Sequence, residues 1–145
     1  MDNSRQFESG KAVRRRASTQ KGSAIIEGAC VTLVFLAMIF GIMDWSRMMF
    51  ANNFVSSAAR DATRYAMVHG SSSSSPALAS DLTTLVKNEA VGLDPTKITV
   101  STTWNPNNSP GSSVTVQVQY SFQGIAPYMP SSMTLKSSST MLISQ

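Results

Sequence analysis

The chain has 145 residues, one cysteine, one histidine and a formal net charge of +4. A single cysteine, Cys30, excludes an intrachain disulfide, and no group of histidine, cysteine and acidic residues has the spacing of a metal site. There is no Ser/His/Asp set and no phosphate-binding glycine loop either, so we expect neither an enzyme nor a protein that uses a cofactor.

The net positive charge is confined to the first 22 residues. This stretch has six basic and two acidic side chains, whereas the other six basic and six acidic groups of the chain cancel. Basic residues beside an apolar helix stay on the cytoplasmic side of a membrane, so the C-terminal bulk is expected on the other side of the membrane. We interpret residues 1–22 as a basic cytoplasmic leader. It is not expected to bind nucleic acid, because the apolar segment that follows explains the charge bias.

An apolar segment follows the leader. From Ser23 to Met43 there are 21 residues, and Glu27 carries the only charge among them. At a rise of about 1.5 Å per residue, a helix of this length spans about 30 Å, the thickness of the hydrocarbon core of a bilayer. A secretory signal is shorter and ends in a small-residue cleavage site, which is missing after Met43. The sequence therefore predicts a single transmembrane helix over residues 23–45.

Three residues mark the far end of this predicted membrane helix. Trp45 and Arg47 suit the membrane interface, where an indole ring and a long cationic side chain reach the lipid headgroups. Asp44 is three residues from Arg47, so the two side chains can pair on one helical face. We expect this group to end the apolar segment and to fix its depth in the lipid.

The lone acid at the start of the segment requires an explanation, because a charge is costly in hydrocarbon. Cleavage between Gly22 and Ser23 would remove the leader and create an amine at Ser23, one helical turn from Glu27. Glycine permits close approach of an extended backbone to a peptidase. The segment resembles the class III signal of type IV pilins and pseudopilins, in which a membrane aspartic peptidase cuts after glycine and glutamate is the fifth mature residue.

Residues 41–66 narrow the resemblance. They read GIMDWSRMMFANNFVSSAARDATRYA, in which an acid, an aromatic residue, a small residue and an arginine precede an alanine-rich AAR-x-x-x-RYA pattern. This segment resembles the end of the first helix of TadE-like minor pilins of tight-adherence (Flp) pili. The resemblance implies a precursor in the bacterial inner membrane. Its implied partners are the prepilin peptidase, the inner-membrane pilus assembly platform, the major pilin, other minor pilins and membrane lipid.

Two interpretations of Glu27 are open. In one, the side chain lies at the level of the headgroups and reaches water at little cost. In the other, its carboxylate pairs with the Ser23 amine of a neighbouring subunit. Two ions that are each costly in hydrocarbon neutralise one another only in the correct register, so such a pair specifies the stagger of subunits more than it adds stability.

A ridge of small side chains follows the start of the same segment. Ala24, Gly28 and Thr32 are spaced four residues apart, which places them on one side of a helix. Ridges of this kind let helices approach closely in lipid. The ridge predicts a contact between subunits, although such a composition is also ordinary for a membrane helix.

Beyond residue 45 the pattern becomes amphipathic. Apolar residues recur at three and four positions from Ala51 to Tyr65, and neither proline nor glycine interrupts residues 42–69. The sequence predicts one continuous helix from about Ser23 to about His69, with residues 46–70 as an amphipathic spine and Gly70 as its C-terminal cap. The alanine-rich face of the spine is expected to lie in a core.

Residues 71–145 are expected to form a periplasmic domain. Ser75 and Pro76 are typical of an N-cap and a first helical residue, and they predict a short second helix that ends by Gly92. The Asp94-Pro95 pair predicts a turn.

The last part of the chain alternates between apolar and polar residues. This period predicts half-buried strands from Ile98 to Trp104 and from Val114 to Phe122, and residues 134–143 form a weaker third strand. The fold class is therefore α+β and pilin-like: a long transmembrane-plus-amphipathic helix, a short second helix and a small antiparallel sheet whose apolar face lies on the spine. No role is assigned to the loops at 105–113 and 125–131.

Taken with the resemblance, these features imply a processed minor pilin or pseudopilin, which stays in the membrane or enters the pilus and is required for its assembly. Two alternatives remain open. One is an uncleaved bitopic inner-membrane protein whose periplasmic domain binds a partner in an envelope secretion machine. The other is an exported adhesin-like domain that uses the helix only as an anchor.

Overall fold

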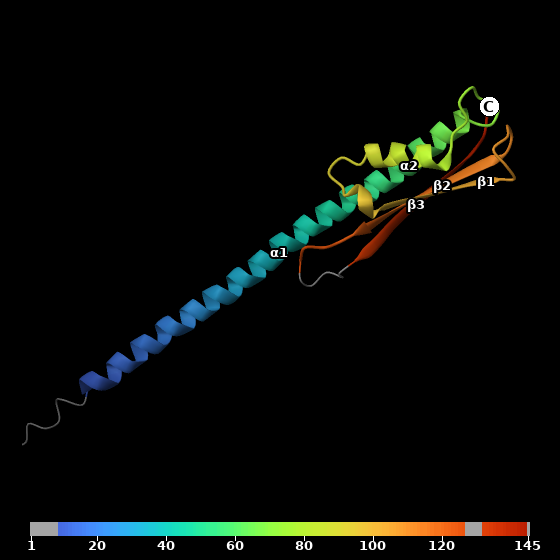
Figure 1. Ribbon diagram of the computed structural model, residues 1–145. Helices are drawn as coiled ribbons and strands as arrows, with labels where there is room; N and C mark the ends of the chain where they lie inside the picture. Colours follow the sequence, from blue (N-terminus) through green and yellow to red (C-terminus); the bar gives the residue numbers. More distant parts are fainter. Residues whose placement is uncertain (1–8, 127–131, 145) are drawn as a thin grey trace, which may run out of the picture. The chain divides into compact units, whose positions relative to one another are not determined.

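The computed structural model describes residues 9–126 and 132–144, with side chains described from Gly22 onward (Figure 1). It contains helix α1 (Ser9–Val68), helix α2 (Ala79–Asn88), the one-turn 3₁₀ helix η1 (Pro95–Lys97) and strands β1 (Ile98–Asn105), β2 (Ser113–Phe122) and β3 (Met133–Leu142). The predicted α+β class, with a long helix, a short second helix and a small antiparallel sheet, is confirmed. The chain divides into two compact units, Met1–Ile42 and Met43–Gln145, which we describe separately.

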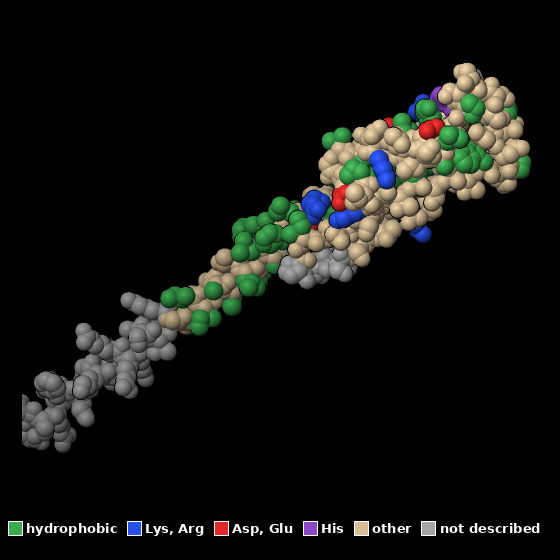
Figure 2. Space-filling model, viewed as in Figure 1, with side chains coloured by type: hydrophobic (Ala, Val, Ile, Leu, Met, Phe, Trp, Pro, Cys, Tyr) green, Lys and Arg blue, Asp and Glu red, His purple; other side chains and the backbone are tan. Residues whose placement is uncertain are grey.

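The described part of the first unit is the N-terminal part of α1. The helix begins at Ser9, upstream of the predicted start near Ser23, because residues 9–22 contain no proline and several good helix formers such as alanine, arginine and lysine. From Gly22 onward nearly all side chains of this unit are exposed, including Ile25 at 72% and Leu33 at 70%. Figure 2 shows the hydrophobic side chains gathered over this segment. Nothing in the described chain covers them.

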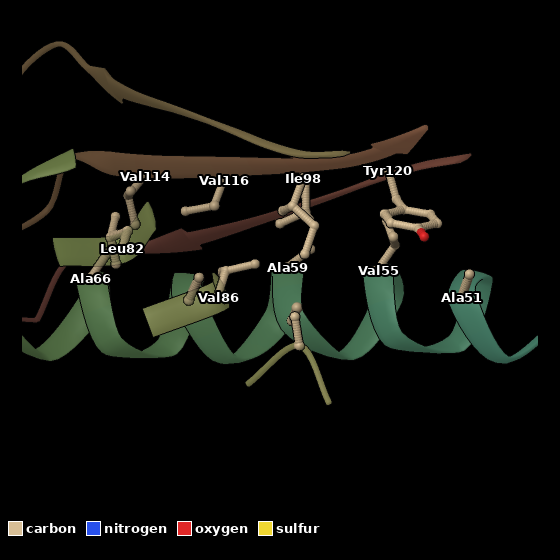
Figure 3. Packing of buried hydrophobic residues seen from close by; sticks show 14 of the residues in the cluster. Ala51, Val55, Ala59, Ala66, Leu82, Val86, Ile98, Val114, Val116 and Tyr120 are labelled. Atoms are coloured by element: carbon tan, nitrogen blue, oxygen red, sulfur yellow. The ribbon is translucent and has the colours of Figure 1, made fainter. Parts of the chain in front are cut away.

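The second unit is built on the C-terminal part of α1, which supplies a row of small buried residues. Alanine predominates in this row because a small side chain lets a sheet approach the helix closely, and the predicted core position of the alanine-rich face is confirmed. Figure 3 shows Val55 directed toward Tyr120 of β2. Among the described side chains of α1, the fully buried residues are Asp44, Ala51, Val55, Ala58, Ala59, Ala62, Thr63 and Ala66.

The sheet has the order β1-β2-β3 with antiparallel neighbours, so β2 is its central strand. Along β2, fully buried residues alternate with half-buried ones, as the predicted period of two requires. Val116 lies opposite Thr102 of β1 and Ser139 of β3. The buried face of β2 packs against the small residues of α1 and against Leu82 of α2, and these contacts form the core.

The C-terminus of α1 differs from the prediction. The helix ends at Val68, and Gly70 is not a left-handed cap, since the described glycines with positive φ are Gly92 and Gly111. Other groups satisfy the last carbonyls instead. The Tyr65 carbonyl accepts from the His69 backbone N–H at 3.2 Å and lies 2.9 Å from His69 Nδ1.

Helix α2 also begins later than predicted. Its N-cap is Leu78, not Ser75, and Pro76 lies outside the helix. The Asp81 carboxylate accepts a hydrogen bond from the Leu78 backbone N–H at 3.0 Å, and this charged acceptor in the first turn fixes the start of the helix. The predicted turn at Asp94 is confirmed, because its carboxylate accepts from the Thr96 N–H at 2.9 Å and starts η1.

Candidate functional site

The predicted cleavage site lies within a helix. Gly22 and Ser23 are both part of α1 and both exposed. A Cβ atom added at Gly22 would meet nothing within 4 Å, so packing in the described chain does not require a glycine here. Glycine does weaken a helix by roughly 1 kcal/mol relative to alanine. Its effect in this place is to make the backbone of α1 easier to unwind.

Glu27 lies on the exposed surface of the apolar segment. The apolar residues Ile25, Ile26 and Val31 of the same segment are also exposed. Within the residues whose side chains the structure describes, Glu27 forms no hydrogen bond and no ion pair. The described side chains therefore supply no counter-ion for this carboxylate, and both interpretations of Glu27 remain open.

The predicted small-residue ridge is open along its length. Ala24, Gly28 and Thr32 are all exposed, and a Cβ added at Gly28 would also meet nothing within 4 Å. The Thr32 hydroxyl donates to the Gly28 carbonyl at 2.8 Å. Because this bond satisfies the hydroxyl within its own helix, Thr32 can face lipid or another helix without an unpaired polar group.

The predicted pair between Asp44 and Arg47 is present. Arg47 Nη1 donates to Asp44 Oδ1 at 3.1 Å. The two side chains differ in exposure, since Asp44 is 1% exposed and Arg47 47%. Trp45 is exposed, as expected for a residue at a membrane interface.

Asp44 has a second set of partners, which the sequence did not predict. Its Oδ2 accepts hydrogen bonds from the backbone N–H groups of Ile125 at 2.8 Å and Ala126 at 2.7 Å. The carboxylate therefore fastens the segment that follows β2 to the start of the folded unit. This segment is the first part of the loop that had no assigned role, and its remaining residues, 127–131, lie outside the described residues.

The described residues define an α+β chain in which one helix is long and apolar enough to cross a membrane. Residues 22–64 match the model of a protein family described as TadE-like protein, which confirms the resemblance predicted from the sequence. Proteins of this family are associated with tight-adherence pili, and the match covers less than half of this chain. It starts at Gly22 and does not include α2 or the sheet. No curated protein and no solved structure matches the chain.

Proposed function

We propose that the chain is a minor pilin or pseudopilin, which a prepilin peptidase cleaves between Gly22 and Ser23 and which is required to assemble a tight-adherence (Flp) pilus. It has no catalytic role in this proposal. The basic leader places the N-terminus in the cytoplasm and the folded unit in the periplasm. The partners are the peptidase, the inner-membrane assembly platform, the major pilin and other minor pilins.

The observation that carries this proposal is the exposed carboxylate of Glu27, which has no partner among the described side chains and stands in an apolar segment. Cleavage supplies the missing cation, because it creates an α-amine at Ser23 in every mature subunit. Within one chain Ser23 is four residues from Glu27, and an adjacent subunit displaced along the helix axis can bring its own amine to the carboxylate. The open ridge of Ala24, Gly28 and Thr32 lets two such helices come close enough.

One observation favours an uncleaved bitopic membrane protein as the second candidate. Helix α1 passes through Gly22 and Ser23 without a break, so the bond to be cut is not presented in an extended form. In that case the folded unit would bind a partner in an envelope secretion machine, and the leader would remain attached. The two candidates differ in whether the peptide bond between Gly22 and Ser23 is cleaved.

Mass spectrometry of the chain extracted from membranes tests the proposal. In cells with the prepilin peptidase, we expect the mature chain to begin at Ser23, and in cells without it to begin upstream of Gly22. A Gly22→Val variant should accumulate as precursor in both strains, because a branched side chain obstructs the close approach of the backbone. A chain that keeps residues 1–22 in piliated cells would favour the second candidate instead.

A further inference from the structure

The second unit contains a small pocket, lined in part by α1. Its volume is about 240 Å³, and its lining includes Ser46, Arg47, Phe50, Leu93, Tyr120 and Phe122. Arg47 and Ser46 contribute polar side chains to this lining. Aromatic and aliphatic side chains from α1, β2 and the α2–η1 connection supply the rest. A pocket lined by both polar and apolar side chains suits an amphiphilic ligand.

Most hydrogen-bond donors of Arg47 have no acceptor among the described residues. A guanidinium carries five N–H groups, and among the described residues one of them is engaged, in the bond to Asp44. Its Cζ lies 5.5 Å from the centre of the Phe122 ring, so the ring holds the cation beside the pocket. Asp44 engages Arg47 through Oδ1 alone, because its Oδ2 accepts from two backbone N–H groups. The free donors match the oxygens of a phosphate group.

The position of Arg47 in the sequence indicates which kind of phosphate group is near the pocket. Arg47 is four residues after Met43, where the uninterrupted apolar segment ends, and this is about 6 Å of helical rise. If that segment lies in hydrocarbon, Arg47 is at the depth of the lipid headgroups. Apolar side chains at this end are also exposed, with Phe50 at 53% and Val91 at 78%. Such exposure is costly in water and favourable against lipid.

Gly92 shapes the apolar side of the pocket. Its φ is +78°, a conformation that favours glycine, and a Cβ added there would lie 3.9 Å from Phe50 Cε1. The connection between α2 and η1 can therefore turn tightly beside Phe50, leaving Leu93 against the pocket and Val91 exposed.

From these contacts we propose that the pocket binds one phospholipid of the membrane that anchors the chain. Arg47 holds the phosphate, and Phe50 and Leu93 contact the glycerol and the first methylenes. The bound lipid fixes the depth and rotation of the folded unit at the membrane surface. This inference rests on the membrane anchoring in the proposed function and is independent of cleavage and of pilus assembly.

Native mass spectrometry of the full-length chain in a non-ionic detergent, titrated with dioleoylphosphatidylglycerol, tests this inference. We expect one lipid to be retained by the wild-type chain. The Arg47→Gln variant should bind it roughly tenfold more weakly, because it loses a charge-assisted contact to the phosphate. The Ser46→Phe variant should show a similar loss by filling the mouth of the pocket, and it leaves the Asp44–Arg47 pair intact. The matched control is Arg60→Gln, which removes an exposed arginine of α1 outside the pocket.

Circular dichroism of each variant establishes that the folded unit is intact. If Arg47→Gln is unfolded, Ser46→Phe decides the result. Equal lipid retention by wild-type chain and folded Ser46→Phe would overturn the proposal. So would equal losses in Arg47→Gln and Arg60→Gln, which would show that only net charge matters. The measurement can be made on the precursor, so a failure here leaves the pilin assignment untouched, and a failure of cleavage leaves lipid binding untouched.

Discussion

A Glu27→Val substitution is expected to abolish piliation while leaving cleavage after Gly22 intact. Valine suits the surrounding lipid, so the helix itself should insert as well as before. What is lost is the partner for the Ser23 amine of the adjacent subunit, which is left as an uncompensated charge in hydrocarbon. Removing one member of a buried ion pair weakens an association by roughly a hundredfold or more. The measurement is the amount of pilus sheared from cells, with the length of the mature chain determined by mass spectrometry.

Two further variants separate charge from shape in this experiment. Glu27→Gln keeps the size of the side chain and removes its charge, so it should fail like Glu27→Val. Val31→Ala alters an exposed apolar residue one turn further along the same helix and should assemble normally. Normal piliation in Glu27→Val would show that the carboxylate merely reaches the headgroups, or that the helix is only an anchor.

The Asp44→Ala substitution is expected to produce the largest loss of stability in the folded unit. It leaves the N–H groups of Ile125 and Ala126 without their acceptor and frees Arg47 from its partner. Unsatisfied buried donors are costly, and in a unit of this size we expect the Tm to fall by roughly 5–15 °C. Thermal unfolding of the full-length chain in detergent, followed by circular dichroism in the β region, measures this change.

Asp94→Ala provides the matched control for Asp44→Ala. Asp94 also accepts a backbone N–H, from Thr96, but it is exposed, so water can replace the lost contact. Its Tm should fall far less than that of Asp44→Ala. Equal effects of the two substitutions would show that the bonds of Asp44 to the segment after β2 contribute little to the stability of the folded unit.

Local patterns predicted most of the fold. The alternation in residues 98–104 and 114–122 predicted the ends of two strands to within about one residue. In a half-buried strand, apolar residues point to the core and polar residues to the solvent, so the residue types indicate the two faces. The row of alanines predicted the buried face of α1, because residues three and four positions apart lie on one side of a helix. The start of α2 was wrong because two N-terminal signals compete there, and the carboxylate of Asp81 fixes the start three residues beyond Pro76.

The contacts of Asp44 could not be predicted in the same way. Its pairing with Arg47 is a local matter of helical spacing and was predicted, whereas its bonds to Ile125 and Ala126 join residues more than 80 positions apart. Every residue except proline has a backbone N–H, so residue type does not reveal which N–H groups Asp44 binds. A single sequence therefore carries no signal for such a contact. The pocket beside Arg47 could not be predicted either, because its lining comes from α1, β2 and the connection after α2, which are far apart in the sequence.

The central claim is that Glu27 of one subunit contacts the Ser23 amine of its neighbour. A membrane-permeant carbodiimide tests this most directly, because it joins a carboxylate to an amine only when the two are in contact. In assembled pili or membranes of piliated cells, the account predicts a cross-linked peptide in which Glu27 is bonded to the N-terminal Ser23 of a second subunit, or to the corresponding amine of another pilin. Coupling of the Ser23 amine to a different acid, or a chain in working pili that still carries its leader, would contradict it.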